Sequence, residues 1–144
     1  MLLPMALLQT LHVFGAILLV GGATTHALLR PMAARAGVEA FRALYQLAWR
    51  VQLWMVYTGS GLLLVTGIIL WIGRFKLLTG WLLLGSLVYV AAMGLDGAFL
   101  APNLRRIRTS GEGASSLAAA AITIQLVAWF LLVVVVFLMV ARPF

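Results

Sequence analysis

The sequence predicts an all-α polytopic membrane protein, a bundle of four transmembrane helices with both termini on the outer side of the membrane. Of the 144 residues, 65% are hydrophobic and only 9% are charged, and four apolar runs are each long enough to cross a bilayer. A soluble domain usually contains about 25% charged residues and under half apolar ones. Because the four runs leave little sequence between them, we expect one membrane domain over residues 1–144.

The first span is expected over Met5–Leu29. A bilayer core about 30 Å thick needs roughly 20 apolar residues in a helix, and this run meets that length. No basic residue precedes it and no clear cleavage motif follows it, so we interpret it as a retained span and not as a signal peptide. Pro31 follows the run, at a position where a helix can end without losing an interior hydrogen bond.

The second span is expected over Arg50–Ile72, after an amphipathic segment over about residues 36–49. Polar side chains recur in this segment at spacings of four and three, with apolar ones opposite them. The polar residues of this pattern are Arg35, Glu39, Arg42, Gln46 and Arg50. The pattern predicts a helix that begins near Val38 and lies partly along the membrane surface before it enters the bilayer.

The third and fourth spans are expected over Lys76–Leu100 and Leu117–Ala141. Pro102 marks the end of the third, and the Gly/Ser-rich segment Thr109–Ser116 predicts a flexible turn before the fourth. None of the runs alternates with a period of two, so they are not the strands of a barrel. Lipid offers the backbone no hydrogen-bond partners, and each run must therefore be helical.

The distribution of basic residues predicts the orientation. The side with the first and third loops carries Arg30, Arg35, Arg42, Arg50, Arg105, Arg106 and Arg108, and the other side carries Arg74, Lys76 and Arg142. Basic loops remain in the cytoplasm, which puts both termini outside. Orientation also explains the net charge of +7. We therefore expect the lipid bilayer as partner and no nucleic acid.

Ionisable and amide side chains inside the spans are the first candidates for a function, because they are costly in lipid. The ones that stand out are His12 and His26 in the first span, Lys76 and Asp96 in the third, and Gln125 in the fourth. The sequence has no cysteine, which excludes disulfides, thiolate metal sites and covalently attached haem. The six methionines show no paired spacing, so a copper path has little support.

The two histidines lie on one stripe of the first helix. They are fourteen residues apart, which places them ~40° apart around the helix and ~21 Å apart along it. Gly15 and Gly22 on the same stripe let a neighbour approach closely, either another helix or a flat macrocycle. This spacing resembles that of di-haem b-type cytochromes, in which imidazole is the axial ligand. We therefore predict haem b on His12 and His26, with Gly15 and Gly22 beside the porphyrin.

The number of histidines leaves the ligation open. Two haems with two histidines each need four, and the chain has two. A parallel homodimer would supply the others, or His12 alone would hold one haem.

Structural roles are alternatives for each of these residues. His12 would then hydrogen-bond to the next helix. His26 would be solvated near the interface or paired with Asp96, and Asp96 would be tied to Arg30, Arg50 or His26. Lys76 would extend its amine outward to water.

Two passages resemble a bacterial family of predicted four-helix membrane proteins of unknown function. They are Leu8-Gln9-Thr10-Leu11-His12-Val13-Phe14-Gly15-Ala16-Ile17, followed by Gly21-Gly22, and Val136-Phe137-Leu138-Met139-Val140-Ala141-Arg142-Pro143. The family opens close to LHVLGAILWVGG and ends close to VVFxMVxKP. A Trp often precedes the paired glycines, where this chain has Leu19-Val20, and Arg142 replaces a Lys. The resemblance covers essentially the whole chain and implies a multi-pass protein of the bacterial inner (cytoplasmic) membrane.

This family is distantly similar to the CopD copper-resistance membrane domain and to the HemJ-type protoporphyrinogen oxidases. All share a first-span histidine in an LHxxG/A context, which His12 matches. The resemblance implies a haem-binding role for His12, and Lys76 could match a lysine that opens a later helix in the oxidases. The Tyr-His pair of those enzymes is missing here, with only Tyr89 nearby, so their reaction is not implied.

The leading functional hypothesis is a small b-type haem-binding membrane protein that transfers electrons or handles porphyrin, with no enzymatic reaction assigned. The alternative is a non-catalytic accessory subunit of a larger, respiratory-type membrane complex, in which the polar residues only tie helices together. Copper or small-solute transport ranks third. Transport pathways usually show broken helices or several buried charges at the midplane, and the sequence indicates neither.

Overall fold

The protein is a bundle of long helices in the computed structural model, which describes residues 2–74, 80–110 and 115–141. Its elements are α1 (Leu2–Ala34), α2 (Val38–Val51), the π-helical segment η1 (Gln52–Tyr57), α3 (Thr58–Arg74), α4 (Gly80–Leu95), the π-helical segment η2 (Asp96–Leu100), α5 (Ala101–Ser110) and α6 (Ser115–Ala141). Four helical stretches are long and apolar enough to cross a membrane: Pro4–Ala34, Val38–Gly73, Gly80–Ile107 and Ala120–Ala141. The predicted fold class is confirmed.

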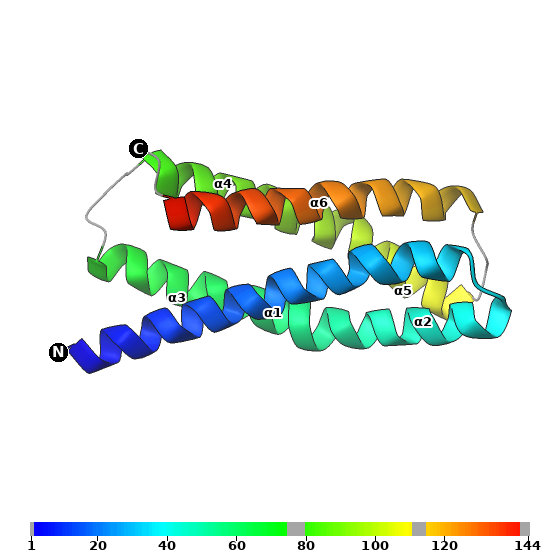
Figure 1. Ribbon diagram of the computed structural model, residues 1–144, viewed down its shortest axis with the longest axis horizontal. Helices are drawn as coiled ribbons and strands as arrows, with labels where there is room; N and C mark the ends of the chain where they lie inside the picture. The colour runs from blue at the N-terminus through cyan, green and yellow to red at the C-terminus, as the bar shows by residue number, and fades with distance from the viewer. Residues whose placement is uncertain (1, 75–79, 111–114, 142–144) are drawn as a thin grey trace.

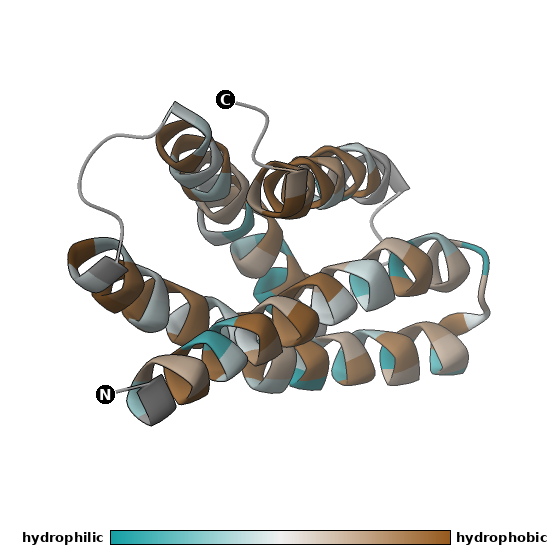
Figure 2. Ribbon diagram, turned by 60° about the vertical axis from the view of Figure 1, so that its left-hand side comes forward, coloured by the Kyte–Doolittle hydropathy of each residue, from teal (hydrophilic) through white to brown (hydrophobic). Residues whose placement is uncertain are grey.

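The helices lie roughly along one long axis (Figure 1). The start of α1 and the end of α6 are at the same end of the bundle, opposite the turn between α1 and α2. α1 packs against α3 and α6, and α4 packs against α6. Hydrophobic residues cover most of the length of the spans in Figure 2. The predicted outer location of the termini stays a prediction.

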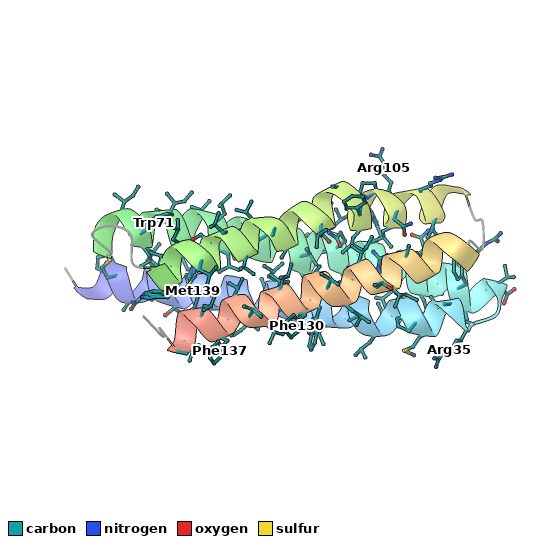
Figure 3. The ribbon with its side chains drawn as sticks, turned by 90° about the horizontal axis from the view of Figure 1, so that it is seen from above. Arg35, Trp71, Arg105, Phe130, Phe137 and Met139 are labelled. Atoms are coloured by element: carbon teal, nitrogen blue, oxygen red, sulfur yellow. The ribbon has the colours of Figure 1, made fainter. Side chains whose placement is uncertain are left out.

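Large apolar side chains point away from the bundle, as expected for helices surrounded by lipid. On α6, Phe130 and Phe137 extend outward in Figure 3 and are 61% and 62% exposed. The opposite side of α6 packs inward, where the Met139 side chain reaches Gly85 of α4. Arg35 and Arg105 extend outward at the far end of the bundle.

Two predicted helix ends are wrong. Pro31 lies inside α1, which continues to Ala34, and Pro102 lies inside α5, which continues the third span to Ser110. Proline near a helix end removes few hydrogen bonds, and here packing stabilises the extra turns. The helices α1, α2 and α5 share a core of Ala33, Tyr45, Ala48, Leu104 and Ile107.

The predicted amphipathic helix begins at Val38, as expected from its pattern. It does not bend away along a surface. α2 packs against α1 and continues through η1 into α3 as one rod (Figure 1). This rod has 36 residues between Val38 and Gly73, or about 54 Å at 1.5 Å per residue, which exceeds a bilayer core of about 30 Å.

The interior contains a second apolar core nearer the middle of the bundle, formed by Leu19, Ala23, Val56, Ala92 and Leu132. Along α1, His26 and Arg30 come between the residues of the two cores, and both side chains are buried. The bundle therefore has a polar layer between two apolar ones.

Candidate functional site

His12 is held in place by α3. Its Nδ1 lies 2.8 Å from Oγ1 of Thr66, and the Thr66 hydroxyl donates its own hydrogen to the carbonyl of Leu62. In this arrangement the threonine oxygen accepts the hydrogen on Nδ1, and the ring also lies within hydrogen-bond reach of the backbone of Leu63. The ring is half-buried. His12 therefore makes the expected bond to a neighbouring helix.

The space beside Gly15 and Gly22 is filled by a helix. A Cβ added to Gly15 would lie 3.1 Å from the carbonyl oxygen of Gly59, and one added to Gly22 would lie 2.8 Å from Cγ2 of Val56. The sequence allowed either another helix or a flat macrocycle beside these glycines. In the structure the neighbour is a helix, formed by η1 and α3. Within one chain, these glycines leave no room for a porphyrin.

His26 is buried, with only 2% of its surface exposed. Solvation near the interface was therefore a wrong expectation, because α1 continues for two further turns and is covered by its neighbours. Neither ring nitrogen has a hydrogen-bond partner within the described structure. The ring lines an internal cavity of about 20 Å³ together with Asp96 and Gln125. Such a cavity has room for about one water molecule and not for a macrocycle.

Five polar residues from all four spans gather around His26, and we call these six residues together the polar cluster. They are His26 and Arg30 on α1, Gln52 on η1, Asp96 on η2, Asn103 on α5 and Gln125 on α6. All but the half-buried Asn103 are buried, and Gln52 is fully inaccessible. Buried ionisable groups in a membrane are rare and need partners.

The partners inside the cluster differ from those expected. Asp96 accepts a 2.7 Å hydrogen bond from Nε2 of Gln52. Arg30 donates to the carbonyl of Leu100 at 3.2 Å and to Oδ1 of Asn103 at 3.4 Å. Arg30 and Asp96 attract each other electrostatically, as expected, but neither Arg50 nor His26 makes a hydrogen bond to the carboxylate in the described structure.

Both π-helical segments begin at a residue of the polar cluster. Gln52 is the first residue of η1, and Asp96 is the first residue of η2. In η2 the amide of Ala101 bonds to the carbonyl of Asp96, five residues back. π-helical turns are rare, and many of them occur at functional sites. The second and third spans are thus irregular at the position where their polar side chains meet.

Further polar bonds join the remaining helices. Nε1 of Trp129 donates to Oγ1 of Thr24 at 2.9 Å, and the hydroxyls of Ser60 and Tyr89 are 2.7 Å apart. Among the described residues, no group of three or more His, Cys, Asp or Glu side chains could hold a metal ion. Lys76 lies outside the described residues.

A family model described as "Predicted integral membrane protein (DUF2269)" matches residues 6–143. The chain belongs to this family. No curated protein and no solved structure matches it. The family description agrees with the four long apolar helices: this DUF2269 protein is a multi-pass integral membrane protein. The relation to the CopD domain and to the HemJ-type oxidases stays a prediction, and so do the bacterial origin and the choice of membrane.

Proposed function

We propose that this DUF2269 protein binds one haem b in the membrane, and that Nε2 of His12 would hold its iron. The observation that supports this is the hydrogen bond between Nδ1 of His12 and Thr66. Histidines that bind metals usually donate their other ring N–H to a nearby acceptor, which fixes the tautomer and the ring orientation. His12 has this arrangement within a membrane span.

Fewer residues can hold a haem than the sequence analysis predicted. His12 would supply one ligand to the iron. His26 faces a cavity of about 20 Å³, and the room beside Gly15 and Gly22 is occupied by η1 and α3. The proposal therefore assigns one haem to His12 and gives His26, Gly15 and Gly22 no part in holding it. When bound, haem b would supply one-electron transfer.

The residues around His12 position the imidazole. Thr66 accepts from Nδ1, and its own hydroxyl is oriented by the carbonyl of Leu62. Gly67 leaves space for the ring, because a Cβ there would lie 3.3 Å from Cε1 of His12. Removal of such a supporting hydrogen bond typically lowers metal affinity by roughly 10- to 100-fold. Thr66 is therefore a positioning residue for the proposed ligand.

The absorption spectrum of the detergent-purified protein, expressed with ample haem, tests the proposal. We expect Soret and α bands in the wild type and in His26→Ala, and their loss in His12→Ala. The spin state then reports a second ligand: a low-spin spectrum indicates a second strong-field ligand, such as a histidine that a homodimer would supply, and a high-spin spectrum indicates none. A colourless wild type, or an unchanged spectrum in His12→Ala, contradicts the proposal.

An accessory role in a larger membrane complex is the second candidate. It is supported by the use of polar side chains as links between helices, such as Trp129 to Thr24 and Tyr89 to Ser60. In this case the buried polar groups would specify the packing of the bundle only. Purification in mild detergent distinguishes the two: a stoichiometric partner bound to a colourless chain supports this candidate. Recovery as an isolated haem-containing homodimer contradicts it.

A further inference from the structure

The starting observation is the unpartnered imidazole of His26. A buried polar group without a hydrogen bond costs about 1–3 kcal/mol, and both ring nitrogens of His26 are in this position in the described structure. Oε1 of Gln52 and Nε of Arg30 are also buried without partners. The orphaned groups come from three of the six residues of the polar cluster, so they mark one place in the bundle.

The cavity beside His26 matches the missing partner in size and in chemistry. Its volume of about 20 Å³ exceeds the roughly 10–15 Å³ that one water molecule needs. A buried water needs two to four polar partners, and His26, Asp96 and Gln125 all line the cavity. Because Gln52 occupies Oδ2 of Asp96, the second carboxylate oxygen remains available.

We propose that this cavity holds one water molecule that bridges His26 and Asp96, and that the two residues with this water form a proton-binding site inside the membrane. An imidazole and a carboxylate are the side chains that exchange protons most readily near neutral pH. A proton that reaches the water passes to a free ring nitrogen of His26 or to the free oxygen of Asp96. No redox change is involved, and no haem is needed.

Charged and polar groups from all four spans surround the site, and Arg30 opposes a positive charge on His26. On α1, Arg30 supplies a positive charge that balances the carboxylate, and Tyr45 of α2 interacts with the same guanidinium. Gln52 of η1 donates to Asp96, Gln125 of α6 completes the cavity wall, and Asn103 of α5 binds Arg30. The rest of the cavity wall is largely apolar, with Leu19, Val56, Ala92 and Leu132 among its residues. The negative charge of Asp96 and the positive charge of Arg30 cancel. An added proton would therefore give the site a net positive charge.

Nuclear magnetic resonance of the haem-free full chain, labelled with ¹⁵N-histidine in lipid nanodiscs, tests the water. The chain has only two histidines, so His12→Ala assigns the signals. We expect a cross-peak between water and a ring N–H of His26, and a shift of the His26 signals in Asp96→Asn with His12 unchanged. Absence of the cross-peak, together with identical His26 signals in Asp96→Asn, overturns the proposal.

Infrared difference spectra between acidic and alkaline buffer test proton binding. The chain has three carboxylic side chains, and Glu39 on the exposed face of α2 offers the control Glu39→Gln. We expect a change in a carboxyl band or in an imidazole band that disappears in Asp96→Asn or His26→Ala and persists in Glu39→Gln. If neither Asp96 nor His26 changes protonation over this range, the site is not a proton-binding site.

Filling the cavity provides a test that does not remove a polar residue. Ala128 lines the cavity and is 4% exposed, and Ala121, seven residues earlier on the same side of α6, is 5% exposed and lines no part of it. We expect Ala128→Val to displace the water, abolish its cross-peak and lower Tm more than Ala121→Val does. If Ala128→Val raises Tm and leaves the His26 signals unchanged, the cavity is dry and the proposal is wrong. All three tests use haem-free protein, so their outcome is separate from that of haem binding.

Discussion

His12 and His26 occupy the same stripe of one helix, yet their surroundings differ in almost every respect. His12 is half-buried, and its Nδ1 is bonded to Thr66 of the neighbouring helix. His26 is fully buried beside a small cavity, with both nitrogens unpartnered in the described structure. Around His12 the neighbouring helix is regular, whereas around His26 two spans contain π-helical turns. Spacing on one helix therefore placed both imidazoles on the packed face, and the other helices determined what each could do.

The largest loss of stability is expected when the buried cation of the polar cluster, Arg30, is removed. Arg30→Met removes two hydrogen bonds, to Leu100 and Asn103, and leaves the charge of Asp96 without its balance. A hydrogen bond to a charged group typically contributes about 1.5–3 kcal/mol. We expect a large drop in Tm in detergent, measured by scanning fluorimetry.

The matched control is Arg42→Met on the exposed face of α2, which should change stability by about 0.5 kcal/mol or less. Equal Tm values for the two variants would show that the polar cluster contributes little to stability. The surroundings of His26 would then differ from those of His12 in structure but not in their contribution to stability.

The next effect concerns the close contact of α1 and α3 on the His12 side. A Cβ at Gly59 would lie 2.6 Å from the backbone nitrogen of Leu19, so Gly59→Ala forces the helices apart. Overpacking of this kind typically costs about 1–3 kcal/mol. Gly61, two residues later, has nothing within 4 Å of an added Cβ, and Gly61→Ala should be neutral or stabilising by up to about 1 kcal/mol. Thermal unfolding of both variants would check this contrast, and a similar Tm for the two would contradict the close contact.

The spans could be predicted from the sequence because the length of an apolar run is a local property. The start of α2 at Val38 could be predicted for the same reason, since its polar spacing repeats over four turns. The helix ends at Pro31 and Pro102 could not, because they depend on the core that α1, α2 and α5 form together. Tertiary packing outweighed the local proline signal at both positions.

The polar cluster was only partly accessible to sequence analysis. His26, Asp96 and Gln125 stand out as polar residues in apolar runs, and the proximity of His26 and Asp96 could be anticipated. Gln52 gave no such signal because it follows Arg50 at the expected edge of a span. Its bond to Asp96 depends on two π-helical turns, which change the direction of the side chains and leave no pattern in the sequence.

The smallest effect is expected for the hydrogen bond that holds His12. Thr66→Val keeps the volume of the side chain but removes the acceptor for Nδ1, which should cost about 0.5–1.5 kcal/mol of stability. Thr10→Val is the control, because Thr10 is exposed and bonds only within its own helix, to the carbonyl of Ala6. If His12 binds haem, Thr66→Val should also weaken haem binding by roughly 10- to 100-fold in a titration followed at the Soret band. Thr10→Val should leave the affinity unchanged. A structural link predicts the small loss of stability alone, so an unchanged haem affinity in Thr66→Val would leave His12 as a tie between two helices and remove the main support for the haem site.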